Sequence, residues 1–309
     1  MLVGIDADVL VYQCAFAAQK SFVTVKDLEG NDLGEYKNKT EAKKEHGKDI
    51  VVENQLILDP VEYCLHSIKK KIELILQRCK ATEYKCFITG SGNFREKVLK
   101  PVLALEGTHF QGYKANRSAP KPVYYQDARD YLVNNCGAQI IEGKEADDEL
   151  ATQLTLGAID ICASIDKDLT TVPGMHFNWD KMKKPTKISK IAAMRFFYQQ
   201  LIMGDKADNI MGCRGEGDRS PYLAEIAKCR TEKQMWDIVV SAYKLAELRA
   251  EDHRKEGGKW ENHRPIKNIE LEIVINARLL WMLREPFDGK LWKPPHLRDK
   301  NSSGNEGAW

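Results

Sequence analysis

The chain has 309 residues, 43% of them hydrophobic and 30% charged, which is enough to bury one large α/β domain or a catalytic domain with a smaller helical partner. Its 47 Lys and Arg residues nearly balance its 45 Asp and Glu residues, so the formal charge of +2 does not by itself indicate a polyanionic partner. The eight cysteines lack the close pairing of a zinc site, and no run is long and apolar enough to span a membrane, which favours buried thiols and a cytoplasmic location.

The hydrophobic pattern of residues 1–190 predicts an α/β fold, because short apolar runs alternate with longer helical patterns. Strands are expected at 2–5, 86–89, 138–141 and 159–165, in a largely parallel sheet. Asp59 and Pro60 are suited to begin a helix that covers this sheet. The polar residues 19–58 predict an excursion outside the core, as a hairpin or a mobile loop.

The pattern becomes mostly helical from residue 191, which divides the chain into a catalytic domain, 1–190, and a helical C-terminal region, 191–309. Helices are expected at 191–203, 222–248 and 269–283. The charged residues 251–265 predict a surface loop, and the polar last dozen residues predict a frayed tail.

Two pairs of aspartates follow expected strands. Asp6 and Asp8 follow the first strand, and Asp166 and Asp168 follow the strand at 159–165. The carboxyl ends of parallel strands share one edge of a sheet, where ligands bind in open α/β folds. Aspartates also end strands simply because they favour turns, so neither pair alone indicates a site.

Two further acidic groups lie later in the chain. Glu145, Asp147 and Asp148 open a helical pattern, where negative charge also complements the helix dipole. Asp205 and Asp208 are spaced to project from one side of a helical turn, although an N-cap cluster has the same pattern.

The four acidic groups together predict a metal site. Carboxylates brought together repel by up to about 4 kcal/mol per close pair at an effective dielectric of about 20, so a fold gathers them only around cations. Oxygen ligands without a Cys or His constellation favour Mg²⁺, with Mn²⁺ as a substitute, over zinc. Two such ions can activate a water and stabilise the leaving oxygen of a phosphodiester.

The segment from Arg95 to Lys121 is locally basic, and such side chains can hold phosphates. A solvated surface is the usual explanation for such a run, although Tyr113-Lys-Ala-Asn-Arg117 adds further pattern here, and it remains the favoured explanation for a second basic stretch at 181–190. The glycines that follow Asp208 allow backbone amides to approach a phosphate closely.

Six short motifs, in this order, resemble the phage exonuclease branch of the 5′-nuclease and flap-endonuclease family. They are Gly4-Ile-Asp6, Phe94-Arg95, Tyr113-Lys-Ala-Asn-Arg117, Glu145-Ala-Asp147-Asp148, Ser164-Ile-Asp166-Lys-Asp168 and Gly204-Asp205-Lys-Ala-Asp208-Asn209. Residues 276–294 extend the resemblance to nearly the whole chain. The resemblance implies a PIN-like domain, whose central and mainly parallel sheet is flanked by helices, and a helical C-terminal region with a helix-hairpin-helix-like DNA-binding segment.

The resemblance also implies the roles of individual residues. Two divalent ions would be held by Asp6, Glu145, Asp147, Asp148, Asp166, Asp168, Asp205 and Asp208. Arg95 and Lys114 would contact the scissile phosphate. Further DNA contacts are expected at Tyr113, Asn116, Arg117, Lys121, Gly212, Gly215 and Gly217. The family's glycine-rich segment, which grips duplex DNA and can hold a potassium ion, corresponds to residues 211–220 within the loop 204–220.

Two departures from the family pattern bear on the substrate. Gly90 stands where the family usually has an acidic residue, so one metal ligand is absent or replaced by water. Pro120 and Pro122 leave little room for a long helical arch, which favours 5′-to-3′ exonuclease action on duplex DNA with a free 5′ end over cutting of 5′ flaps. The RNA strand of an RNA–DNA hybrid is a further substrate that the resemblance implies, and a phage-encoded enzyme would act in the host cytoplasm.

Three alternative functions remain open. A haloacid-dehalogenase-type phosphatase would use Asp6 as its nucleophile, but it leaves the acidic groups at 145–148 and 166–168 without a role. A catalytically impaired, structure-specific DNA-binding protein would account for Gly90. An RNA-cutting PIN-domain nuclease would share the metal chemistry, although such proteins are usually shorter.

Overall fold

The computed structural model describes residues 1–96, 112–256, 266 and 268–298. The chain forms two compact units. The sheet unit comprises Met1–Ala7, Ile75–Ala119 and Ala138–Trp309, and the hairpin unit comprises Asp8–Leu74 and Pro120–Gly137. This division does not coincide with the expected boundary after residue 190, because the C-terminal helices belong to the same unit as the large sheet.

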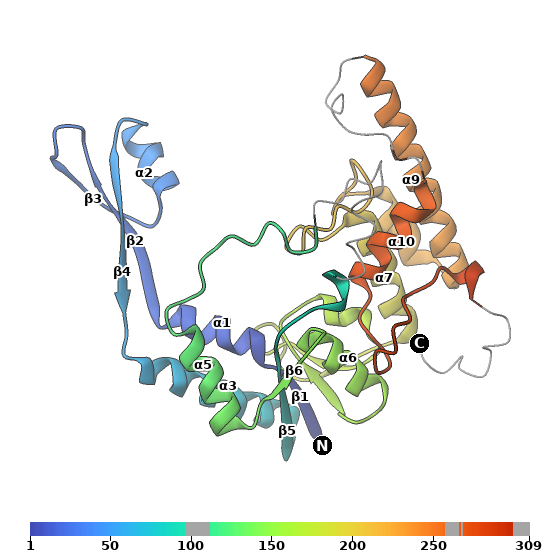
Figure 1. The fold of residues 1–309 in the computed structure, drawn as a ribbon, viewed down its shortest axis with the longest axis horizontal. Helices are drawn as coiled ribbons and strands as arrows, with labels where there is room; N and C mark the ends of the chain where they lie inside the picture. The colour runs from blue at the N-terminus through green and yellow to red at the C-terminus, as the bar shows by residue number, and fades with distance from the viewer. Residues whose placement is uncertain (97–111, 257–265, 267, 299–309) are drawn as a thin grey trace. The chain divides into compact units, whose positions relative to one another are not determined.

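The described part of the sheet unit contains a six-stranded sheet with the order β6-β5-β1-β7-β8-β9 (Figure 1). Its strands are β1 (Leu2–Asp6), β5 (Glu83–Thr89), β6 (Gln139–Ile141), β7 (Ile161–Ala163), β8 (Gly174–Phe177) and β9 (Thr186–Ile188). All neighbouring strands are parallel except β8 and β9, which are antiparallel. The structure therefore confirms an α/β fold with a mainly parallel sheet, and it adds two strands at one side of the sheet, β8 and β9, that the sequence did not predict.

Helix α6 (Ala146–Thr155) packs on the centre of this sheet. Leu150 of α6 shares a core with Phe87 of β5 and Cys162 of β7. Gly4 of β1 allows this close packing, since a Cβ there would lie 2.5 Å from Ile159 Cδ1 and 2.8 Å from Leu150 Cδ2. The first turn of α6 is thereby fixed beside the carboxyl ends of the central strands, which is where the predicted site lies.

The C-terminal part is helical, as expected. It contains α7 (Lys190–Met203), α8 (Pro221–Lys228), α9 (Glu232–Lys255), α10 (Ile269–Leu280) and the short 3₁₀ helix η2 (Pro295–Leu297). Another 3₁₀ helix, η1 (Asp168–Thr171), lies between β7 and β8. These α-helices surround a second core that includes Phe197, Trp236 and Tyr243. The single helix expected at 222–248 is two helices, because Thr231 and Gln234 form a capping box that begins α9.

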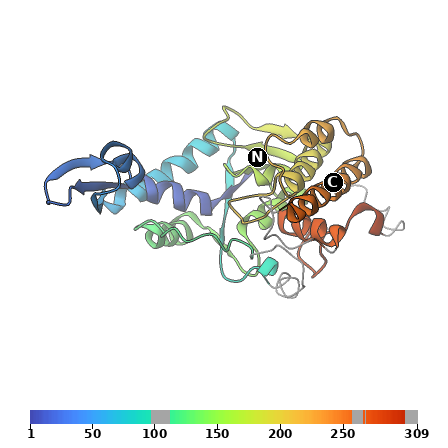
Figure 2. The same ribbon diagram turned by 90° about the horizontal axis from the view of Figure 1, so that it is seen from above.

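The hairpin unit contains a small antiparallel sheet with the order β3-β2-β4, drawn in dark blue in Figure 2. The helices and strands that lie wholly or mostly in this unit are α1 (Ala7–Ala17), β2 (Gln19–Lys26), β3 (Asp32–Tyr36), α2 (Lys39–His46), β4 (Val51–Leu58), α3 (Val61–Cys79) and α5 (Tyr125–Cys136), with the end of α3 from Ile75 in the sheet unit. Val23, Val25 and Ala42 form its core. Of the two forms predicted for residues 19–58, the structure has the hairpin.

The remaining expectations about side chains and membranes can be compared directly. The eight cysteines are free, and all except Cys136 are buried. Within the described residues, no helix combines the length and the apolar character that a membrane span requires.

Candidate active site

Asp6 and Asp166 meet at the carboxyl ends of β1 and β7, as the strand pattern predicted. Asp6 is only 2% exposed. Ser164 Oγ donates a hydrogen bond of 2.7 Å to Asp6 Oδ2, and it accepts one of 3.0 Å from the backbone N–H of Asp166. Ser164 therefore fixes the two aspartates relative to one another. This role of Ser164 was not identified from the sequence, although a hydroxyl residue two positions before an aspartate that follows a strand indicates it.

Asp147 lies in the first turn of α6, among the other carboxylates. The Ala146 N–H donates a 2.9 Å hydrogen bond to Thr89 Oγ1, which attaches the beginning of α6 to the end of β5. Burial, together with the charges of Asp6, Asp166 and Glu145, raises the pKa of Asp147 well above its ordinary value, and Lys114 opposes this effect. Acidic groups from three parts of the chain thus form one electrostatic site.

Asp168 and Asp205 extend this acidic site toward α7. Burial and the charges of Asp166 and Asp205 raise the pKa of Asp168 to about 8. Gln200 of α7 donates a 2.6 Å hydrogen bond to Asp168 Oδ1, a positioning contact that the sequence analysis missed. Burial also disfavours the charged form of Asp205, but the hydrogen bond and charge of Lys167, 3.1 Å away, lower its pKa below the ordinary value.

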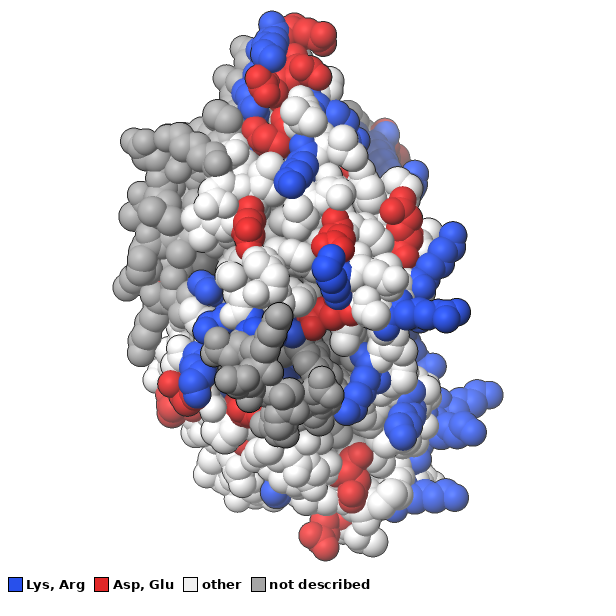
Figure 3. Space-filling view, turned by 90° about the vertical axis from the view of Figure 1, so that its right-hand side faces the viewer, with Lys and Arg blue, Asp and Glu red and all other residues white. Residues whose placement is uncertain are grey.

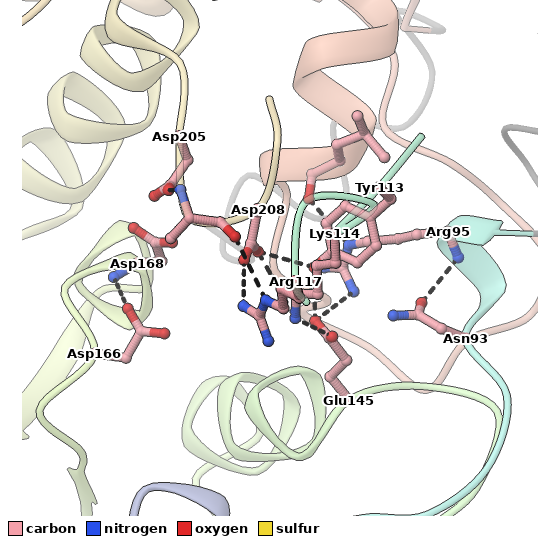
Figure 4. A network of polar contacts seen from close by, with 12 residues as sticks. Asn93, Arg95, Tyr113, Lys114, Arg117, Glu145, Asp166, Asp168, Asp205 and Asp208 are labelled. Carbon is pink, nitrogen blue, oxygen red and sulfur yellow. Dashed lines mark hydrogen bonds and ion pairs between the residues drawn. The ribbon is translucent and has the colours of Figure 1, made fainter. Parts of the chain in front are cut away.

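Basic and phenolic side chains from residues 113–117 meet the acidic groups (Figure 4). Lys114 forms an ion pair with Glu145, and Arg117 Nη2 lies 2.5 Å from Asp208 Oδ1. The Tyr113 hydroxyl lies 2.8 Å from Glu145 Oε2 and 3.1 Å from Asp208 Oδ2. Burial and these acidic neighbours raise the pKa of Tyr113 well above its ordinary value, with Arg95 opposing, so the phenol remains a proton donor.

The segment that carries these side chains is fastened to the loop at 205–209. The backbone N–H of Lys114 donates to the Asp208 carbonyl at 2.9 Å, and Asn209 Nδ2 donates to the Gly112 carbonyl at 2.8 Å. Asn116, which was expected to contact DNA, donates a 2.7 Å hydrogen bond from Nδ2 to the Lys206 carbonyl within the protein. Lys114 and Asn209 both have positive φ, 55° and 59°, a conformation uncommon outside glycine. The two segments therefore hold each other in a defined shape.

The structure gives Arg95 and Asp148 roles that differ from the expected ones. Arg95 is 1% exposed, and its guanidinium binds both carboxylate oxygens of Asp148 at 2.5 and 2.9 Å. Arg95 also donates to the carbonyls of Leu279 and Trp281. Asp148 is fully buried in this pair, and its Oδ2 also accepts a 3.4 Å hydrogen bond from the Glu145 N–H. The two residues join the beginning of α6 to the end of α10, and Arg95 Nη1 also lies 3.7 Å from Glu145 Oε2.

The glycine-rich loop is shaped by close backbone packing at one of the predicted DNA contacts. Gly212 has φ +65°, and a Cβ there would lie 2.2 Å from the backbone nitrogen of Gly204. Gly212 is therefore needed for the loop itself. Gly215 also has positive φ, 76°, whereas a Cβ at Gly217 would meet nothing within 4 Å. Lys121, another expected contact, belongs to the hairpin unit, where its Nζ lies 4.0 Å from the ring centre of Tyr125.

Glu142 lies where a side chain of Gly90 would be. A Cβ on Gly90 would be 2.4 Å from Glu142 Oε1. The other carboxylate oxygen accepts hydrogen bonds from the Ser91 N–H and hydroxyl at 2.7 and 2.6 Å. Glu142, which follows the end of β6, thus places a carboxylate beside Gly90. Sequence reasoning missed Glu142 because it lies 52 positions from Gly90.

A divalent cation bound at this site would take its ligands from the Asp and Glu side chains. Within the described residues, no three His, Cys, Asp or Glu side chains converge closely enough to hold an ion. Lys114, Arg117 and Lys167 instead contact Glu145, Asp208 and Asp205. The residues nevertheless fit a hard cation in their chemistry, since the groups crowding Asp147 are all carboxylates and their repulsion disfavours its charged form.

The surface charge is mixed outside the site. The second basic stretch contributes five lysines that are all exposed: Lys181, Lys183, Lys184, Lys187 and Lys190. Figure 3 shows basic and acidic side chains interspersed on one face, with Lys and Arg gathered toward one edge. Local clusters, and not the net charge, are therefore the features to compare with a polyanionic ligand.

No protein-family model and no curated protein matches the chain. Among solved structures, it is similar to the D15 protein of bacteriophage T5 co-crystallised with metal ions, at 14% identity over 90% of this chain and 98% of that chain, with a TM-score of 0.42. It is similar to the T5 5′-exonuclease with bound zinc, at 16% identity over 89% and 99% of the two chains, with a TM-score of 0.44. It is also similar to the catalytic core of Rad2 in complex with a DNA substrate, at 13% identity over 89% and 73%, with a TM-score of 0.40.

Proposed function

We propose that the chain is a metal-dependent nuclease that hydrolyses DNA phosphodiesters at the acidic edge of its sheet. The observation that carries this proposal is the state of Asp147, whose pKa is raised by burial and by three other carboxylates. A cluster that disfavours its own charge is expected to bind a cation, and all-oxygen ligands match Mg²⁺ or Mn²⁺.

The proposed cation position lies between Asp147 and Asp166. Among the described residues, no Lys or Arg lies at ion-pair distance from either of these two carboxylates, whereas Glu145, Asp205 and Asp208 each have a basic partner. Asp6, held by Ser164, would complete a first ion site, and Asp168, Asp205 and Asp208 would supply a second. When bound, the ions would supply an activated water and stabilise charge on the phosphate oxygens. Asp148 is left out of this ligand set because Arg95 binds it.

Lys114 and Arg117 are the proposed phosphate contacts. Both lie beside the carboxylates and are partly exposed, with side-chain accessibilities of 22% and 56%. A phosphate oxygen could accept hydrogen bonds from them in place of Glu145 and Asp208. Asn209 and the backbone bonds of Lys114 fix the segment from which both side chains extend, so they would be oriented before the substrate arrives.

The proposed substrate is duplex DNA with a free 5′ end, cut in the 5′-to-3′ direction. The order of the six motifs, which resembles phage 5′-to-3′ exonucleases, supports this direction. Pro120 and Pro122 leave little room for a long helical arch, which favours exonuclease action over the threading of 5′ flaps; residues 97–111, which come before them, lie outside the described residues. Hybrid duplexes are a second proposed substrate, and the loop at 211–220 is the proposed contact with the duplex backbone and with K⁺.

The test uses linear duplex DNA labelled separately at its 5′ and 3′ ends, with Mg²⁺, Mn²⁺ or a chelator, beside a 5′-flap substrate. Early release of the 5′ label that the chelator prevents is expected. Asp147→Ala and Asp166→Ala should abolish cutting and leave DNA binding intact, while Asp237→Ala, on an exposed face of α9, should cut normally.

Each other outcome of this experiment points to a different function. Full activity in both site variants would refute the metal assignment. Binding without cleavage would favour the impaired DNA-binding protein. Release of phosphate from small phosphomonoesters, without DNA cleavage, would favour the phosphatase.

A further inference from the structure

Arg284 is a buried cation whose hydrogen-bonding capacity is only partly used. It is 7% exposed, and its Nη2 donates a 2.7 Å hydrogen bond to the Thr171 carbonyl. Nε and Nη1 are buried and have no hydrogen-bond partner among the described residues. A buried donor without a partner destabilises the fold, and a charged one does so more strongly, so this arrangement calls for a ligand.

Among the described residues, no carboxylate forms an ion pair with the guanidinium of Arg284. Asp148 acts on it only at longer range, because the Asp148 oxygens are already bound by Arg95 and by the Leu283 N–H. Burial lowers the pKa of Arg284 to about 9, with Asp148 opposing, so the side chain still carries its charge at neutral pH.

Arg284 lines a small cavity in which other features favour an anion. The cavity has a volume of about 10 Å³ and is lined by Thr171, Pro173, Lys190, Ala193, Met194, Phe197, Trp281 and Arg284. Lys190 supplies a second positive charge and is the first residue of α7, whose positive dipole end lies there. The Arg284 guanidinium lies 4.6 Å from the ring centre of Trp281, which holds it against one wall.

We propose that this cavity binds a phosphate group, one oxygen of which enters it. The volume has room for about one water-sized atom, so a single oxygen fits beside Arg284. The remainder of the phosphate would lie toward Lys190, which is exposed. The site is separate from the carboxylate cluster, and it stands whether or not the chain is a nuclease.

The test is a calorimetric titration of the metal-free protein with inorganic phosphate at constant ionic strength. Saturable binding is expected in the unaltered protein and in Lys187→Ala, a control that removes an exposed lysine of β9 outside the cavity. Lys190→Ala should weaken binding about tenfold, as expected for the loss of one charged contact. Arg284→Met should abolish it. Absence of saturable binding, or equal binding in all variants, would overturn the proposal.

A crystallographic measurement keeps the proposal testable if Arg284→Met does not fold. Crystals of the unaltered protein soaked in arsenate should show the anomalous peak of arsenic at the mouth of the cavity, with one arsenate oxygen within hydrogen-bond distance of Arg284 Nη1 or Nε. A water molecule as the sole occupant would refute the site. Competition by a short DNA duplex for inorganic phosphate would identify a backbone phosphate as the source, whereas phosphate binding that DNA leaves unchanged would identify the free ion.

Discussion

The buried ion pair between Arg95 and Asp148 is expected to control the stability of the fold around the carboxylate cluster. The two side chains are 1% and 0% exposed, and Arg95 makes two hydrogen bonds to Asp148 and two more to backbone carbonyls. Removing one partner of a buried pair leaves an uncompensated charge and costs about 3–5 kcal/mol. Arg95→Met and Asp148→Asn should therefore each lower the free energy of unfolding by about that amount.

The assay is urea unfolding of both single variants and of the double variant. Since each single change already destroys the pair, the cost in the double variant should be smaller than the sum of the two single costs by at least about 1 kcal/mol. Lys233→Met removes one member of an exposed pair, with a lysine side chain 79% accessible, and should change stability by less than about 1 kcal/mol.

The same variants distinguish the structural role of Arg95 from direct contact with a phosphate. Arg95→Met should lower stability and leave the DNA affinity of the folded protein unchanged in a chelator. A stability loss below about 1 kcal/mol, combined with weaker DNA binding, would refute the reasoning and restore the phosphate contact that the motif suggested.

Three further predictions follow from single positions. Burial lowers the pKa of His176 from 6.5 to about 4, so as pH falls the unfolded chain takes up this proton before the folded chain does. The free energy of unfolding should therefore fall by about 3 kcal/mol between pH 6.5 and pH 4, measured as the difference from His176→Gln over the same range. Gly204→Ala should cost more than about 1 kcal/mol in unfolding free energy, because φ is +70° and the new Cβ would lie 2.3 Å from the Ile210 carbonyl oxygen, whereas Gly217→Ala should be nearly neutral. Asp147→Asn should raise the thermal unfolding temperature of the metal-free protein and abolish cleavage, since burial and the neighbouring carboxylates disfavour the charged form of Asp147; a lower unfolding temperature would contradict the crowding.

The acidic edge of the sheet could be predicted because its information is local in the sequence. Asp6 and Asp166 follow recognisable strands, Asp147 lies at the beginning of a helix, and parallel strands place their carboxyl ends together. Asp6 and Asp166 meet for this reason, bridged by Ser164. The same logic failed for β8 and β9, which have only four and three residues and no continuous apolar run.

The partners of the charged groups could not be predicted because they depend on contacts between distant segments. Arg95 reaches Asp148 across 53 positions and the Leu279 carbonyl across 184. Nothing near Phe94-Arg95 in the sequence indicates that the guanidinium turns into the core. By contrast, the sequence does contain a signal for the division between α8 and α9, because Thr231 and Gln234 have the spacing of a capping box. This signal was overlooked because the helical period continues on both sides of it.

The distribution of basic partners within the acidic site has a consequence for how it would work. Lys114, Arg117 and Lys167 lie on Glu145, Asp208 and Asp205, so these carboxylates are already stabilised in the folded chain. Asp147 and Asp166 instead have raised pKa values, because burial and the other carboxylates disfavour their charge. A cation that binds between Asp147 and Asp166 would therefore stabilise the two carboxylates that the protein's own basic side chains stabilise least. Lys114 and Arg117 need not leave the site when it binds, and they remain beside it in a position to meet the negative charge of a phosphate.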